Sequence, residues 1–434
     1  MTRLPIRNLA LCSALACSAA SDATLEPPEA TNAVQAPLSA ADAPAAPDAP
    51  DNAPDDAPPA AREPRSGAKP QVMQGAEAAF ARVVELISSD YMDAQIDRDT
   101  LYTGAIEGML ARLYQTKHAA APVNALLSPR ELKHIDSSSA GSIGGVGLVI
   151  EPVGADFVIR AILDGTPAQR SGLQVGDRIL GVDATRVKGI PLVELVDLIR
   201  GEPGTAIDLF VQRDTEEWHE RLERATITLR NVEGRTVAPG VGLLRFLSFI
   251  DTTPADLDRE LDTLAAAGTK SLIIDLRYCP GGLLDVATGV VERFLERGQR
   301  VVTLVDRDGR REERTASADG RWRGWPLAVL IGPDTASSAE LFAEALAVHR
   351  KAVTIGQPTL GKHSAENIHP LDNGWALKLS ESRMIGARGE DTTGGLAPML
   401  PVPLSAVPVP PPLDSPASQD TAVRVATEWL RSRS

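Results

Sequence analysis

A serine in the last third of the chain has the surroundings of a nucleophile, and a lysine follows it after a turn. An apolar strand is expected over 326–331, and a helix follows it because apolar residues recur at helical spacing from Leu341 onward. Ser337 falls at the N-terminal end of that helix, where unpaired backbone N–H groups and the helix dipole stabilise negative charge on oxygen. Lys362 follows a turn that contains Gly361. The start of this helix is therefore a plausible place for a nucleophile.

The same serine also fits a role that involves no chemistry. Ser337 and Glu340 have the S-x-x-E spacing of a capping box, in which the serine caps the helix and the glutamate bonds back to it. Both interpretations place Ser337 at the start of the helix. Taken alone, this local pattern favours the cap over the nucleophile.

Five residues of this region match a family pattern position by position. They are a serine followed three positions later by glutamate, and then a T-x-G-K segment: Ser337, Glu340, Thr359, Gly361 and Lys362. In these residues, and over most of its length, the chain resembles the carboxyl-terminal processing peptidases, which are serine proteases of family S41 with a Ser-Lys dyad. The resemblance implies that Ser337 is the nucleophile and Lys362 the general base, with Glu340 and Thr359 in supporting positions.

One position near the lysine departs from that pattern. The family usually has glutamine four residues after the lysine and glycine directly after it, whereas this chain has Glu366 and His363. Keeping a lysine neutral at pH 7 costs roughly 4–5 kcal/mol. An ionised carboxylate about 4 Å away favours the charged lysine by up to about 4 kcal/mol more at an effective dielectric near 20. We therefore expect Glu366, the third candidate catalytic residue, to be protonated, turned away, or the mark of a slow or inactive enzyme.

A glycine pair between a predicted strand and a predicted helix is the candidate oxyanion hole. The strand over 271–276 leads into R-Y-C-P-G-G-L, which starts at Arg277. Glycines at such a junction leave backbone N–H groups exposed, although a tight turn also accounts for Gly281. The family has a similar D-L-R-x-N-P-G-G-L segment. The resemblance implies that the amides of Gly281, Gly282 and Ser338 bind the oxyanion, with Arg277 in support.

The region 144–213 resembles a PDZ domain. A glycine-rich loop precedes an alternating strand, and G-T-P-A-Q-R-S-G-L-Q-V-G-D follows. Backbone N–H groups of such a loop can receive the C-terminal carboxylate of a peptide that adds a strand to the sheet. Tight turns alone are the alternative reading of the glycines. The residues expected to bind peptide are Gly145, Val146, Gly147, Leu148, Leu195, Leu198 and Ile199.

Composition and motifs exclude several other classes of function. The formal net charge of the 434 residues is −14, and no basic stripe is present to bind nucleic acid. The segment 356–362 imitates the phosphate loop G-x-x-x-x-G-K, but His363 stands where a Ser or Thr would bind magnesium. There is no Cys/His cluster at metal-ligand spacing. We therefore expect no metal and no other cofactor.

The N-terminal region indicates export from the cytoplasm. Arg3 and Arg7 precede a short apolar run, as in a secretory signal peptide, and the run is too short to span a bilayer. The sequence around Cys17 reads equally as a cleavage site or as an imperfect lipoprotein box. The Ala/Pro/Asp-rich stretch that follows cannot bury a core. A periplasmic protein and a lipid-anchored protein are both consistent with this pattern.

These observations predict an α+β multidomain protein, and the resemblance implies a crotonase/ClpP-like α/β core for its protease part. The expected order is signal peptide, disordered linker, helical N-terminal domain, PDZ domain, S41 peptidase core, and Pro-rich linker with C-terminal helix: 1–20, 21–72, 73–136, 137–230, 231–405 and 406–434. The resemblance implies an extracytoplasmic endopeptidase that recognises polypeptide substrates by their C-termini. The alternative is a weak or inactive PDZ-bearing scaffold, and the sequence does not set the number of subunits.

Overall fold

The computed structural model of the protein describes residues 9–10, 75–92, 96–113, 123–228, 230–390, 393–403 and 419–433. The predicted linker 21–72, Cys17 and the Pro-rich stretch 404–418 lie outside the described residues. So does the predicted signal peptide, apart from the two-residue strand β1 (Leu9–Ala10), which pairs with β14 (Gly282–Leu283). The chain forms two units, residues 21–102 and residues 1–20 together with 103–434.

Helices form in the N-terminal region where apolar spacing predicts them. They are α1 (Ala76–Asp90) and α2 (Arg98–Leu113), which begins in the first unit and continues into the second. Within the first unit, the rings of Phe80 and Tyr102 lie 6.4 Å apart, and Val84 is the one buried residue of α1. The helical N-terminal part of the predicted fold class is thus present.

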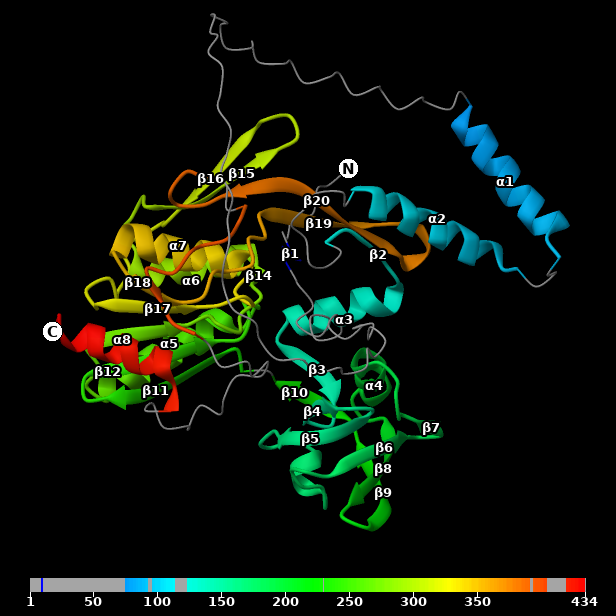
Figure 1. The fold of residues 1–434 in the computed structure, drawn as a ribbon, viewed down its shortest axis with the longest axis horizontal. Helices are drawn as coiled ribbons and strands as arrows, with labels where there is room; N and C mark the ends of the chain where they lie inside the picture. Colours follow the sequence, from blue (N-terminus) through cyan, green and yellow to red (C-terminus); the bar gives the residue numbers. More distant parts are fainter. Residues whose placement is uncertain are drawn as a thin grey trace, which may run out of the picture. The chain divides into compact units, whose positions relative to one another are not determined.

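The PDZ region of the second unit is built on a small sheet, and the loop 145–148 leads into it (Figure 1). Its strands lie in the order β4-β5-β6-β8-β9, with β7 beside β6, and α4 (Leu192–Ile199) packs on them. Short strands β3 and β10 pair with each other at its base. The bounds are β3 (Ser142–Gly145), β4 (Leu148–Val153), β5 (Asp156–Ile162), β6 (Arg178–Val182), β7 (Thr185–Arg186), β8 (Ala206–Arg213), β9 (Glu216–Glu223) and β10 (Ala225–Thr228).

The core of the second unit is built on a six-stranded sheet in the order β11-β12-β13-β17-β18-β21. All its pairs are parallel except β11 with β12. Its central strands are continuous apolar runs because both faces of the sheet are covered. The bounds are β11 (Val232–Ala238), β12 (Val241–Phe246), β13 (Ser271–Asp275), β17 (Leu327–Ile331), β18 (Val353–Gly356) and β21 (Leu400–Pro401).

Alternate residues of these strands face two separate hydrophobic clusters. On one face, α5 (Thr253–Ala266), α6 (Leu284–Val291) and α7 (Ser338–Arg350) pack around residues such as Leu244 and Val329. On the other face, α8 (Thr421–Arg431) packs on Leu243 and Ala328. The last helix of the chain is therefore part of the core.

A second sheet lies beside the core and carries the lysine segment at one end. Its order is β16-β15-β20-β19, and β2 pairs with β20. Turns at Asp308-Gly309 and Asn373-Gly374 join two of its hairpins. The bounds are β2 (Ala125–Leu127), β15 (Arg300–Asp306), β16 (Arg311–Thr315), β19 (Ser364–Pro370) and β20 (Ala376–Ile385), and the helix α3 (Pro129–Ser139) follows β2. None of the helices in the described ranges combines the length and apolarity that a membrane crossing needs.

Candidate active site

Ser337 lies at the junction between β17 and α7 in a strained backbone conformation. Its φ of 59° and ψ of −125° are unusual for a residue with a side chain, and the residue is fully buried. Such strain costs on the order of 1–3 kcal/mol and persists only where surrounding contacts enforce it. The backbone N–H of Ser337 donates to Glu340 Oε2 at 2.7 Å, which is one of those contacts.

The Glu340 carboxylate ties the serine segment to the lysine segment. Besides Ser337 N–H, its Oε2 accepts the backbone N–H of Lys362 at 2.9 Å. Its Oε1 accepts the hydroxyl of Thr359 at 2.6 Å and the N–H of Gly361 at 2.7 Å. Burial raises the pKa of Glu340, and these hydrogen bonds partly oppose that rise. Glu340 therefore does bond back to Ser337 as a capping box predicts, and it also holds the T-x-G-K segment in place.

The structure brings the predicted nucleophile and base together. Lys362 Nζ donates to Ser337 Oγ at 3.5 Å and to the carbonyl of Ser364 at 3.4 Å. Its shortest contact is with Glu366 Oε2, at 2.8 Å. The side chain of Lys362 is 8% exposed and that of Glu366 is fully buried, so water screens the pair poorly.

The Glu366 carboxylate faces the lysine and is held there by hydroxyl groups. Its Oε1 accepts from Ser364 Oγ at 2.7 Å and from Ser380 Oγ at 3.3 Å. A carboxylate turned away from the lysine, one of the three expectations, is therefore wrong. The two oxygens of Glu366 accept hydrogen bonds from two hydroxyls and one amine. This set of donors fits an ionised carboxylate, which can only accept hydrogen bonds. The arrangement is that of a buried ion pair next to the serine.

The glycine pair lies against the serine with no room for side chains. A Cβ on Gly281 would come 3.1 Å from Ser337 Cβ and 2.8 Å from the carbonyl oxygen of Ala336. A Cβ on Gly282 would come 2.2 Å from the carbonyl oxygen of Phe249. Both glycines have positive φ, 98° and 144°. Gly281 thus lies against Ser337, and the hydroxyl of Ser338 donates to the carbonyl of Gly282 at 3.3 Å. The turn and the close approach both require glycine.

Cys279 is buried beneath this glycine pair and supports the serine segment. Its carbonyl oxygen accepts the backbone N–H of Ala336 at 3.2 Å. Burial raises the pKa of the Cys279 thiol to about 12, although a hydrogen bond from the Gly281 amide opposes the rise. A thiol of that pKa is almost entirely protonated at neutral pH and is a poor nucleophile.

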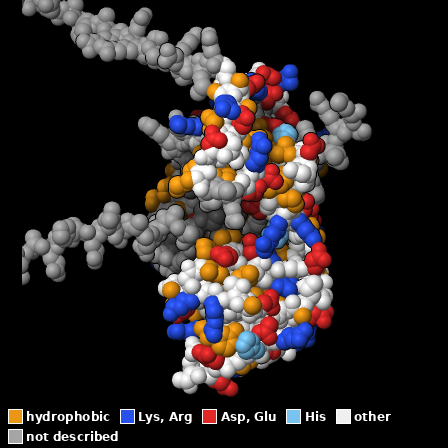
Figure 2. All heavy atoms as spheres, turned by 90° about the vertical axis from the view of Figure 1, so that its right-hand side faces the viewer, with side chains coloured by type: hydrophobic (Ala, Val, Ile, Leu, Met, Phe, Trp, Pro, Cys, Tyr) orange, Lys and Arg blue, Asp and Glu red, His pale blue; other side chains and the backbone are white. Residues whose placement is uncertain are grey.

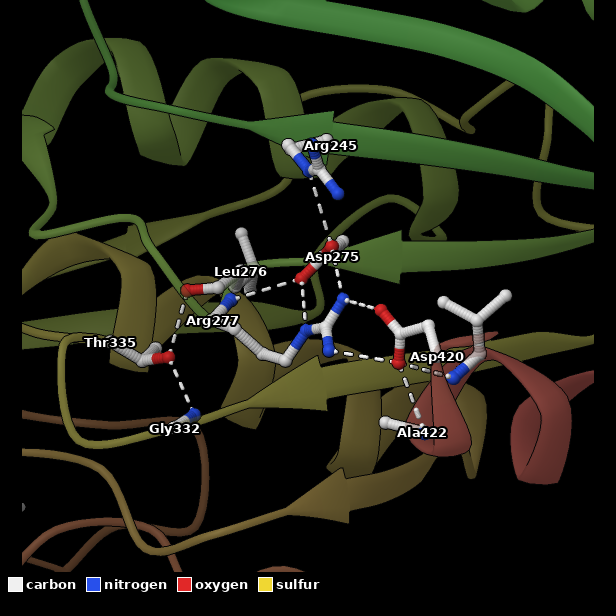
Figure 3. A network of polar contacts seen from close by, with 9 residues as sticks. Arg245, Asp275, Leu276, Arg277, Gly332, Thr335, Asp420 and Ala422 are labelled. Carbon is white, nitrogen blue, oxygen red and sulfur yellow. Dashed lines mark hydrogen bonds and ion pairs between the residues drawn. The ribbon is translucent and has the colours of Figure 1, made fainter. Parts of the chain in front are cut away.

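A network of buried charges that sequence reasoning missed surrounds Arg277 (Figure 3). The guanidinium bonds Asp275 through Nε and Nη2, each at 2.8 Å, and Asp420 through Nη1 and Nη2 at 3.1 and 2.7 Å. Arg245 Nε contacts the other side of Asp275 at 3.3 Å. Burial opposes ionisation of Asp275, but Arg277 and Arg245 outweigh it and hold the pKa of that carboxyl below its ordinary value. The one feature of the sequence that pointed to this network was Asp420, an aspartate directly before the predicted C-terminal helix.

The residues predicted to bind peptide belong to the PDZ region as expected, but they differ in exposure. Gly145, Val146 and Gly147 are buried and lead into the half-buried Leu148 at the start of β4. The list from α4 divides in the same way: Leu195 and Ile199 are buried in the domain core, and Leu198 is half-buried. Gly147 has a φ of 86°, and a Cβ there would come 2.3 Å from Thr166 Cβ. Leu198 is therefore the α4 residue of the three that remains accessible to a ligand.

Basic and acidic side chains are interspersed over the face drawn in Figure 2, without a basic stripe among the described residues there. No group of three or more His, Cys, Asp or Glu side chains in the described part of the chain is placed to hold a metal ion.

Comparisons with known proteins divide the chain into two recognised parts. Residues 240–402 match the model of peptidase family S41, and residues 158–213 match that of the PDZ domain. The carboxy-terminal processing protease CtpA of Bacillus subtilis is 30% identical over 310 residues, which are 71% of this chain and 65% of that protein. A CtpA-like serine protease of Staphylococcus haemolyticus is 27% identical over 314 residues, 72% of this chain and 62% of that protein. The chain thus spans slightly less than two thirds of these curated relatives.

A solved structure supports the fold. A protein of Bacteroides fragilis assigned to the S41 proteases superimposes with a TM-score of 0.51 over 81% of this chain and 97% of its own, at 16% identity. At that identity the likeness concerns the fold alone. It agrees with the α+β architecture described above.

Proposed function

Since the chain is a PDZ-containing member of peptidase family S41, the family of the carboxy-terminal processing proteases, we propose that it is a serine endopeptidase with a Ser337–Lys362 dyad. The observation that carries this proposal is the position of Lys362 Nζ, 3.5 Å from Ser337 Oγ in a site where both side chains are nearly inaccessible to water. A slightly long hydrogen bond of this kind is common before substrate binds.

The proposed reaction is acyl transfer to serine and then to water. Ser337 Oγ attacks the carbonyl carbon of a peptide bond while Lys362 Nζ takes its proton. The backbone amides of Gly282 and Ser338 stabilise the tetrahedral oxyanion, whereas the Gly281 amide, which the resemblance also implied as a donor, bonds the Cys279 thiol. The amine leaves with the proton returned by Lys362. Water then attacks the acyl-enzyme, with the lysine again as base, and releases the acid.

Glu366 changes the energetics of the base in two opposing ways. As a charged neighbour 2.8 Å away it attracts the positive charge of the lysine and so opposes the role of the lysine as a base. It also stabilises the lysinium that forms when the proton is taken. The alternative function, a PDZ-bearing scaffold without catalysis, is favoured by the fact that Lys362 lies closer to Glu366 than to Ser337.

The PDZ region would select the substrate. We propose that the backbone of the loop 145–148 receives the C-terminal carboxylate of a polypeptide, which then pairs with β4 beside α4.

The N-terminal pattern around Cys17 supports a protein that acts outside the cytoplasm, either periplasmic or lipid-anchored.

A fluorophosphonate probe and casein digestion test the dyad. We expect wild type to be labelled and to digest casein, and we expect Ser337→Ala and Lys362→Ala to do neither. Labelling that survives Ser337→Ala would show that another residue is the nucleophile. If wild type and Glu366→Gln both fail to label and to digest casein but still bind peptide, the result would favour the scaffold function.

A further inference from the structure

The C-terminal helix is joined to the proposed oxyanion segment by one carboxylate. Asp420 caps α8, because its Oδ1 accepts the backbone N–H groups of Ala422 at 3.1 Å and Val423 at 3.2 Å. The same carboxylate binds the guanidinium of Arg277 through two hydrogen bonds. Figure 3 shows Arg277 between Asp275 on β13 and Asp420 at the start of α8. A residue far away in the sequence thus completes the environment of the R-Y-C-P-G-G-L segment.

The Arg277 guanidinium is paired with two carboxylates, and one of them comes with α8. The side chain of Arg277 is 5% exposed, and Asp275, which it shares with Arg245, is fully buried. Without Asp420, Arg277 would keep only a carboxylate that a second guanidinium also binds. An uncompensated buried charge is strongly unfavourable, so without Asp420 the guanidinium would be drawn toward water.

A shift of Arg277 would be transmitted directly to the catalytic amides. Arg277 is four residues before Gly281, and its own backbone N–H is fixed to Asp275 Oδ1 at 3.2 Å. The carbonyl of Leu276, its neighbour, accepts from Thr335 Oγ1 at 2.8 Å, and Thr335 lies two residues before Ser337. The chain is therefore anchored at Leu276 and Arg277, directly before the segment that carries the glycines.

We propose that Asp420 is a positioning residue for catalysis: docking of α8 fixes Arg277 and thereby the Gly282 amide at the distance an oxyanion needs. This inference rests on the proposed serine-protease function. A displacement of about 1 Å at a catalytic group can cost on the order of 100-fold in rate.

The full chain with Asp420→Asn tests the proposal, because asparagine caps a helix as well as aspartate does but carries no charge. We expect kcat on labelled casein, and the rate of fluorophosphonate labelling of Ser337, to fall about 10- to 100-fold while KM changes less than about threefold. Glu428→Gln is the matched control, since Glu428 pairs with Arg424 on the exposed side of the same helix. It should leave both rates unchanged.

A second variant separates positioning from simple loss of stability. Arg277→Gln combined with Asp420→Asn removes the unbalanced charge, so it should regain thermal stability relative to Asp420→Asn alone and keep the low kcat. A double variant that regains both stability and kcat would overturn the proposal, as would an Asp420→Asn enzyme with wild-type kcat.

Hydrogen exchange gives a readout that does not depend on activity. The backbone amides of 277–283 should exchange faster in Asp420→Asn than in wild type and Glu428→Gln. If wild type itself is not labelled and does not digest casein, the proposed function is wrong. If the exchange rates of 277–283 are the same in Asp420→Asn and wild type, the coupling between α8 and the glycines is wrong.

Discussion

Lys362 Nζ lies 2.8 Å from Glu366 Oε2 and 3.5 Å from Ser337 Oγ, so the amine proposed as the base is bound more closely by a carboxylate than by the nucleophile. A buried carboxylate that accepts from Ser364 and Ser380 cannot turn away without leaving two hydroxyls unpaired. The ion pair is thus a built feature of the site, and the reactivity of the serine depends on how the lysine loses its proton there.

Glu366→Gln should make the enzyme faster at neutral pH. Glutamine keeps a dipole beside the lysine but removes the charge that favours the protonated amine. We expect kcat/KM at pH 7 to rise at least about tenfold, corresponding to about 1.4 kcal/mol, and the pH–rate profile to extend to lower pH. Glu381→Gln is the control, since Glu381 bonds Asn367 and His369 on the same sheet and not Lys362. Identical pH profiles for wild type and Glu366→Gln would mean that the carboxylate does not govern the base.

A methyl group on the glycine pair should inactivate the enzyme. In Gly282→Ala the new Cβ would meet the carbonyl oxygen of Phe249 at 2.2 Å, at a φ of 144° that alanine rarely adopts. We expect fluorophosphonate labelling to fall by two orders of magnitude or more, in line with about 2.7–4 kcal/mol for a lost oxyanion donor. Gly289→Ala in α6 is the control, because nothing lies within 4 Å of its Cβ and φ is not positive there. Normal labelling of Gly282→Ala would contradict the proposed oxyanion hole.

Cys279 should be inert in the native protein. With a pKa raised to about 12 by burial, roughly one thiol in ten thousand is ionised at pH 8, and it is shielded from reagents. A full-length chain with Cys12→Ser and Cys17→Ser should therefore react with Ellman's reagent only after unfolding in guanidinium. The sign of the pH effect follows from the same shift: the native state resists deprotonation, so the free energy of unfolding should fall as the pH rises toward 12. Rapid labelling of the native protein at pH 8 would show that the thiol is accessible.

Peptide binding to the PDZ region should depend on a free carboxylate. A fluorescent peptide with a free C-terminus should bind the Ser337→Ala protein, which cannot digest it, and the same peptide with an amidated C-terminus should bind at least about tenfold more weakly. Gly147→Ala should also weaken binding, because a Cβ there would meet Thr166 at 2.3 Å in a left-handed conformation. Equal affinity for the free and the amidated peptide would rule out carboxylate recognition.

Local patterns predicted those parts of the protein that local physics determines. The buried strands are visible in the sequence as apolar runs because both faces of the sheet are covered. The glycine pair is visible because neighbouring backbone lies too close to Gly281 and Gly282 for a side chain. Contacts between distant segments were beyond such patterns. The pairing of Arg277 with Asp420 joins residues 143 positions apart, and no spacing rule connects them.

Side-chain orientation was the second kind of information that the sequence lacked. The residue type at 366 showed that a charge was present, but its direction depends on the hydroxyls of Ser364 and Ser380. The burial of Leu195 and Ile199 likewise depends on how α4 is turned against the PDZ sheet. A helical apolar stripe does not by itself show which of its members a ligand can reach.

The hydrogen bonds of Glu340 to both segments have a consequence for how the proposed dyad tolerates change elsewhere. One side chain binds the backbones at Ser337 and at Lys362, so the separation of hydroxyl and amine is set by a crosslink and not by the length of chain that runs between them through α7 and β18. An insertion at the turn near Lys351, or new chain ends made there by circular permutation, would therefore keep the Ser337 hydroxyl and the Lys362 amine at the same separation, provided that Glu340 is retained.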